Sequence, residues 1–152
     1  MSFVHQASAA AVLVTLTLWF QCVGMAALIH WGQGPFLRCI HGWDPWRSAL
    51  LLVRFTNLII CLHLLEILLW ACFYRWMCFP SWELAFYFST TSYSTVGYGD
   101  VLLPRMWRTL GPVESVTGVL MCGLSVSLLF AIVTRLVERE AQFSSEARKP
   151  PV

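Results

Sequence analysis

Three long apolar segments divide the chain, at residues 9–29, 49–74 and 109–136. A helix needs about 20 consecutive apolar residues to cross the hydrocarbon core of a bilayer, and each of these segments is long enough to do so. The pattern therefore predicts an all-α membrane protein with three transmembrane helices.

A shorter segment, at residues 81–94, lies between the second and third apolar segments and is too short to span a bilayer. Ser81 is suited to cap the N-terminus of a helix, and Glu83 falls in the first turn, where a negative charge complements the helix dipole. We expect a re-entrant helix, which enters the membrane from one side and ends inside it.

The composition supports a membrane protein, because the chain is 58% hydrophobic and only 12% charged. The net charge is +2 and no run of like charge occurs, so we expect no nucleic-acid partner. The six cysteines form no C-x-x-C pair, and we expect no disulfide framework.

The sequence Thr-Val-Gly-Tyr-Gly-Asp occupies residues 95–100, directly after the short helix. A row of backbone carbonyls can replace the water around a cation when the chain holds the carbonyls pointing inward. Gly97 and Gly99 supply the necessary backbone freedom, because glycine adopts left-handed conformations without steric cost. Thr95 adds a hydroxyl to the row, and the two larger side chains are expected to point away from the ions.

This hexapeptide and its setting resemble the potassium-channel pore family, specifically the small bacterial channels of two transmembrane helices, over roughly residues 47–140. The resemblance implies a homotetramer with the pore on its four-fold axis, potassium as the transported ion, no cofactor, and Asp100 at the outer mouth. It also implies that K⁺ is bound by the residues of a selectivity filter: Thr95, Val96, Gly97, Tyr98 and Gly99.

The resemblance suggests a division of the chain into four parts. We expect an N-terminal transmembrane helix at 1–31 that has no counterpart in the two-helix pore, a cytoplasmic loop at 32–47, a pore domain at 48–140 and a short, frayed tail at 141–152. Within the pore domain the expected elements are an outer helix at 48–76, a pore helix at 81–94, the filter at 95–100 and an inner helix at 108–137.

The residues expected to support the filter depart from the family pattern. Two consecutive pore-helix aromatics that often hydrogen-bond the filter correspond here to Tyr87 and Phe88, and an acidic residue behind the filter corresponds to Thr91. Tyr87 can donate a hydrogen bond to Asp100, whereas Phe88 has no donor. These departures put the rigidity of the filter in question, and not its selectivity.

Several ionisable residues lie inside the predicted spans, where a charge costs from about 3 to more than 10 kcal/mol, and three of them are candidates for a role in the protein interior. Glu114 lies near the depth of the filter, and it either braces the back of the pore helix or makes a structural hydrogen bond with no effect on conduction. His63 and Glu66 are three residues apart on one helix face, and we expect them to pair in the protein interior because two ligands are too few for a metal site.

The third apolar segment is interrupted by Gly118 and Gly123. These glycines serve either as a hinge of the inner helix or as points of close helix packing, and Gly118 is the preferred hinge candidate. Ser125 and Ser127 are candidates for lining a polar cavity. Three later residues are candidates for a hydrophobic gate that excludes water: Phe130, Ile132 and Val133.

The filter sets the expected orientation in the membrane, because its Asp100 end should face the exterior. The N-terminus is then outside, and the loop at 32–47 and the C-terminus are cytoplasmic, which agrees with the positive-inside rule. We expect a multi-pass protein of the plasma or inner membrane.

We interpret the chain as the pore-forming subunit of a potassium-selective channel, and not as an enzyme. Its expected partners are its own copies, the lipid bilayer and potassium ions. One alternative is a non-conducting subunit or ion sensor. The other is a membrane metalloprotein that uses His63, Glu66 and Glu114.

Overall fold

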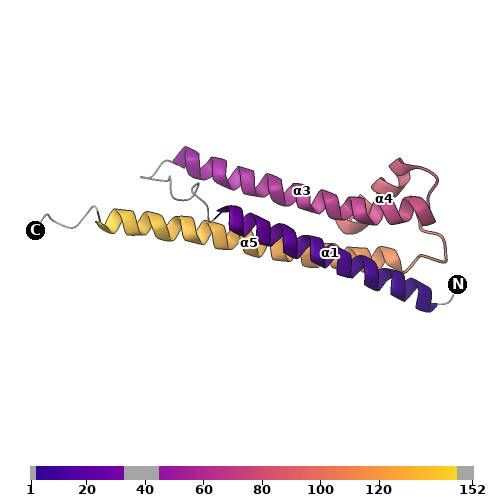
Figure 1. The fold of residues 1–152 in the computed structure, drawn as a ribbon. Coiled ribbons are helices and arrows are strands. Elements are labelled where there is room, and N and C mark those ends of the chain that lie inside the picture. Colours follow the sequence, from indigo (N-terminus) through magenta and orange to yellow (C-terminus); the bar gives the residue numbers. More distant parts are fainter. Residues whose placement is uncertain (1–2, 33–44, 147–152) are drawn as a thin grey trace, which may run out of the picture.

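The computed structural model describes residues 3–32 and 45–146. This part of the chain contains four helices and no strand (Figure 1). The helices are α1 (Phe3–Gly32), α3 (Pro45–Met77), α4 (Trp82–Tyr93) and α5 (Leu110–Glu146).

Three of these helices are long and apolar enough to cross a membrane, over Val4–His30, Ser48–Met77 and Leu110–Arg135. The fourth, α4, has 12 residues and cannot span a bilayer. The prediction of an all-α membrane protein with three spanning helices and one short helix is confirmed.

The boundaries agree with the expected elements in the middle of the chain and differ at its end. The predicted cytoplasmic loop at 32–47 lies largely outside the described residues. The tail at 141–152 was expected to be frayed, and this is wrong for its first part, because α5 continues to Glu146. The residues that follow Arg135 are mostly good helix formers without glycine or proline, so nothing in the local sequence ends the helix there.

The three long helices form one bundle, in which α1 and α5 run in the same direction and α3 runs antiparallel to both (Figure 1). The short helix α4 packs against α3 and α5 at the end of the bundle where α1 begins (Figure 1). The loop at 95–100 is therefore held at the same end of the bundle as the N-terminus.

The two larger apolar clusters of the described residues hold the bundle together, and α1 contributes to both. The cluster beside α4 consists of Leu13, Trp70, Tyr74, Ala85, Phe88, Leu103, Trp107 and Leu110. The cluster nearer the other end consists of Leu28, Leu51, Phe55, Ile59 and Leu128. Because α1 packs against α3 and α5 in both clusters, it is an integral part of the described bundle.

Candidate functional site

The candidate site is the loop at 95–100, which leaves the C-terminus of α4. Two backbone hydrogen bonds fold the loop back onto α4: Thr95 N donates to Ser92 O at 3.0 Å, and Gly97 N donates to Thr91 O at 3.0 Å. The helix thereby determines where the loop begins, and it directs the negative end of its dipole toward the same region.

The backbone of the loop has positive φ at every second residue, with φ of 63° at Thr95, 49° at Gly97 and 78° at Gly99. The two glycines adopt this conformation without steric cost, as the sequence analysis expected of them. A β-branched threonine does not, and a residue held in this region costs about 1–3 kcal/mol. The strain at Thr95 indicates that its surroundings fix the start of the loop.

The loop is open to its surroundings in a single chain. All residues from 95 to 100 are exposed, and Tyr98 and Val96 have 72% and 52% of their surface accessible. Irregular backbone at membrane depth is tolerated only where protein covers it or water fills a cavity beside it. The chain itself leaves the loop uncovered.

Asp100 ends the loop, and both of its carboxylate oxygens accept hydrogen bonds. Tyr87 OH donates to Asp100 Oδ2 at 2.7 Å, which is the contact proposed from the sequence, and Val101 N donates to Asp100 Oδ1 at 3.0 Å. The hydrogen bond to Asp100 raises the pKa of the Tyr87 phenol. This bond fastens the end of the loop to the first half of α4.

The pKa of Tyr87 gives a first testable prediction. The phenol of Tyr87 donates this bond only while it is protonated, so the bond is present at neutral pH. It is lost when the pH passes the raised pKa of Tyr87, which lies above the ordinary tyrosine pKa of about 10. In an absorbance titration, Asp100→Asn should lower the pH at which one of the four tyrosines ionises. Tyr87→Phe should remove that transition, and a titration unchanged by Asp100→Asn would contradict the assignment.

The other two residues expected to support the filter have different partners. Phe88 is buried, and its ring stands edge-on to the ring of Tyr74 with centroids 5.1 Å apart, so it packs α4 against α3. Thr91 Oγ1 donates to Phe88 O at 3.0 Å within its own helix. Only the carbonyl oxygen of Thr91 reaches the loop, through the bond from Gly97 N.

Glu114 of α5 is fully buried and joins three helices. Ser89 Oγ of α4 donates to Glu114 Oε1 at 2.6 Å, and Tyr74 OH of α3 donates to Glu114 Oε2 at 2.9 Å. Ser89 Oγ also lies 2.9 Å from the carbonyl oxygen of Ile67 in α3. Glu114 thus links α5 to both α3 and α4 through side-chain hydrogen bonds.

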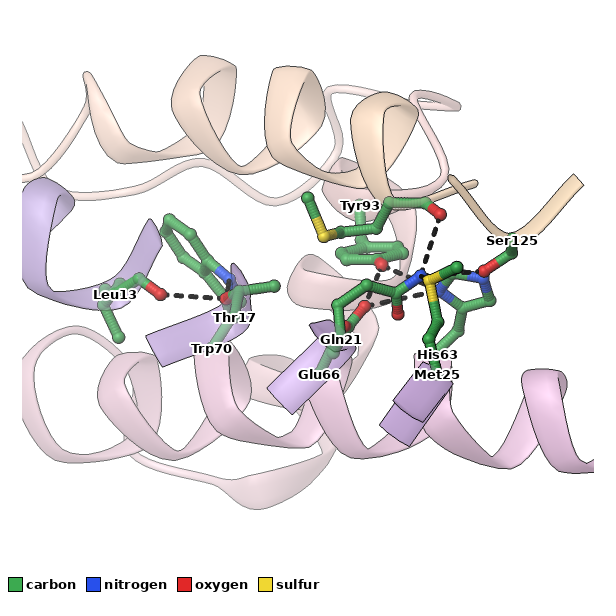
Figure 2. Close-up of polar contacts among 10 residues, drawn as sticks. Leu13, Thr17, Gln21, Met25, His63, Glu66, Trp70, Tyr93 and Ser125 are labelled. Carbon is green, nitrogen blue, oxygen red and sulfur yellow. Dashed lines mark hydrogen bonds and ion pairs between the residues drawn. The ribbon is translucent and has the colours of Figure 1, made fainter. Parts of the chain in front are cut away.

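Glu66 and His63 meet the last residue of α4, Tyr93 (Figure 2). Tyr93 OH donates to Glu66 Oε2, and His63 Nδ1 lies 2.9 Å from Tyr93 OH and 3.3 Å from Glu66 Oε2. The interior pairing of His63 with Glu66 is as expected, but the role of Tyr93 was missed. Among the described residues no group of three or more His, Cys, Asp or Glu is arranged to hold a metal, and Glu114 has other partners.

The two glycines of α5 have different surroundings. A Cβ atom at Gly118 would overlap the carbonyl oxygen of Tyr93 and lie 3.1 Å from Tyr93 Cγ, so α5 passes directly against the end of α4. At Gly123 nothing lies within 4 Å of the same position. Of the two roles considered from the sequence, close packing describes Gly118 in this conformation, and Gly123 is the glycine without such a contact.

The gate candidates and Ser125 also differ in their surroundings. Phe130 and Val133 are exposed, with 72% and 40% of their surface accessible, whereas Ile132 packs against the apolar cluster of Leu28. Ser125 was expected to line a polar cavity, but it is buried and accepts a hydrogen bond at 2.9 Å from Gln21 of α1. It therefore faces α1 in this chain.

Gln21 was not singled out from the sequence, although a usable signal was present. It is an amide in the middle of an apolar span, and polar side chains in such spans usually face the protein interior. Its side chain is fully buried, and its Nε2 also donates to Met121 O at 3.1 Å.

One comparison with known proteins gives a match. A family model with the description "Ion channel" matches residues 60–135, which covers most of α3, all of α4, the loop and most of α5. No curated protein and no solved structure matches the chain.

Proposed function

Because this chain belongs to the ion channel family, we propose that it is the pore-forming subunit of a potassium-selective channel. Residues 95–100 form the selectivity filter, in which the carbonyls of Thr95 to Gly99 and the Thr95 hydroxyl replace the hydration shell of K⁺. Transport is passive and follows the electrochemical gradient, and Asp100 concentrates cations at the mouth.

The observation that carries this proposal is the positive φ at Thr95, Gly97 and Gly99. An ordinary extended strand directs successive carbonyls to opposite sides. A backbone with positive φ at every second residue turns them toward one side instead, as a carbonyl filter needs. The loop also begins at the C-terminus of a helix that is too short to span, where the negative end of the dipole favours a cation.

A homotetramer is the assembly that we propose. One loop cannot surround an ion, and this loop leaves Val96 and Tyr98 uncovered by their own chain. The helix α4 carries further exposed apolar side chains, including Trp82, Leu84 and Phe86. Copies of the same chain around an axis would cover these groups and complete the ring of carbonyls.

The proposed orientation follows from the position of the loop. Since the loop and the N-terminus lie at the same end of the bundle (Figure 1), an external filter mouth puts the N-terminus outside and the C-terminal end of α5 inside the cell. We propose that the protein resides in the plasma or inner membrane.

The proposal is tested with purified protein in liposomes. We expect a potassium flux that barium blocks and that exceeds the sodium flux under the same gradient. Gly97→Ala should bring the two fluxes close to equality, because alanine at φ 49° costs about 1–2 kcal/mol and distorts the carbonyl row. Gly123→Ala is the matched control and should leave the flux ratio unchanged, because it has no contact within 4 Å.

Two results would contradict the proposal. A wild-type flux without preference for potassium would exclude the filter function. A wild-type protein that is thermally stabilised by potassium but conducts no ion would favour the alternative of a non-conducting subunit or ion sensor.

A further inference from the structure

The helix α1 lies outside the matched family region, yet one of its fully buried polar side chains, Gln21, contacts α5. Gln21 Nε2 donates to Met121 O at 3.1 Å and to Ser125 Oγ at 2.9 Å. A primary amide carries two N–H donors, and both can be used on α5. The Sδ atom of Met25, at 3.6 Å in α1, is a weaker third neighbour.

The two acceptors lie on either side of Gly123, so a single side chain holds α5 before and after that residue. No atom lies within 4 Å of a Cβ placed at Gly123, and glycine weakens a helix interior. Gly123 has no side chain of its own to pack, and the bonds from Gln21 connect this turn of α5 to α1.

The helix α1 is itself fixed to α3, which makes it a firm support. Trp70 Nε1 of α3 donates to Thr17 Oγ1 at 3.0 Å, and both side chains are fully buried (Figure 2). One turn beyond Gln21, a Cβ at Gly24 would lie 2.7 Å from the methyl groups of Leu62, so the two helices are in close contact there.

The same part of α5 also contacts the end of α4. The side chain of Met121 packs with Ile67 and Tyr93, and Tyr93 directly precedes Ser94 and the loop. A displacement of α5 at Met121 would therefore disturb both the Gln21 contact and the packing beneath the loop.

We propose that α1 is a built-in negative regulator of the pore, in which the bonds of Gln21 to Met121 and Ser125 hold α5 straight at Gly123 and oppose its bending. This inference rests on the proposed channel function, because the bend would move the later part of α5 away from Leu28 of α1 and widen the pore. Its physical content, a restraint of α5 by α1, can be measured without any flux.

The first test is deuterium uptake by the amides of α5 in the purified, lipid-embedded protein. Gln21→Leu replaces the amide by an apolar side chain and removes both bonds, and it should speed exchange in residues 119–130 of α5 more than in α4. Thr15→Val is the matched control, because Thr15 is exposed on α1 and bonds only to Ala11 O of its own helix, at 2.7 Å. Uptake in α5 equal to that of wild type would overturn the restraint.

The second test is potassium flux into liposomes. Gln21→Leu should raise the flux about tenfold or more at an unchanged ratio of potassium to sodium, which is the order of effect that two neutral hydrogen bonds have on an equilibrium. Unchanged or reduced flux from correctly assembled protein would overturn the regulatory role.

Ser125→Ala keeps the proposal testable if Gln21→Leu fails to fold, since it removes one acceptor and should give a smaller change in the same direction. In the double variant the two effects should not add, because they report one contact. If the wild type conducts no ion but Gln21→Leu still speeds exchange in α5, the proposed channel function fails and the restraint stands. If the wild type conducts and neither variant changes flux or exchange, the inference fails and the function stands.

Discussion

Gly118→Ala is expected to destabilise the protein by more than about 2 kcal/mol and to abolish potassium flux. The added Cβ would overlap the carbonyl oxygen of Tyr93, a backbone atom at the end of α4 that cannot rotate away. Forcing extra volume into a packed interior typically costs about 1–3 kcal/mol. Tyr93, which the added methyl group would displace, also donates the hydrogen bond to Glu66 and lies just before the loop. The damage should therefore extend to the candidate filter.

Gly123→Ala is the control for this prediction, and it should raise the stability of the protein instead of lowering it. Alanine is favoured over glycine inside a helix by about 1 kcal/mol, and nothing at Gly123 resists the added methyl group. Thermal unfolding of both variants in detergent, with subunit assembly checked by size, measures the difference. If the two variants unfolded at the same temperature, the close contact between α5 and Tyr93 would be absent in the protein.

The architecture of the bundle could be predicted because it depends on local properties of the sequence. The lengths of the three apolar segments are enough to identify the spanning helices, and the short segment with Ser81 and Glu83 is enough to identify α4. In the structure Ser81 Oγ accepts a hydrogen bond from Leu84 N at 3.3 Å, as an N-cap does. The positive φ of Gly97 and Gly99 could likewise be anticipated from residue type alone.

The polar contacts between helices could be predicted only in part, since they depend on which helix faces meet. Gln21 and its partner Ser125 are separated by 104 residues, and the sequence does not state how α1 is rotated about its axis. For the same reason several hydroxyls of α4 were equally eligible as partners of Glu114. The structure pairs Glu114 with Ser89 and directs Tyr93 to Glu66 instead.

Glu114→Ala should be the second severe substitution, with a loss of about 3 kcal/mol in stability and a loss of potassium flux. The buried hydroxyl of Tyr74 would have no acceptor, and an unpaired buried polar group costs about 1–3 kcal/mol. The cavity left by the side chain adds to this cost. Ser89 is affected less, because its hydroxyl can still donate to the carbonyl of Ile67.

Glu114→Gln separates the hydrogen bonds of this residue from its charge. The amide oxygen can accept from Tyr74 OH, while the amide N–H can donate to Ser89 Oγ and leave that hydroxyl to donate to Ile67 O. The three helices would stay connected, so we expect a midpoint of unfolding and a potassium flux close to those of wild type. Glu83→Gln, an exposed change in the first turn of α4, controls for the loss of a carboxylate as such. If Glu114→Gln were as harmful as Glu114→Ala while Glu83→Gln was neutral, a negative charge behind α4 would be required, and hydrogen bonding alone would not explain how Glu114 supports the loop.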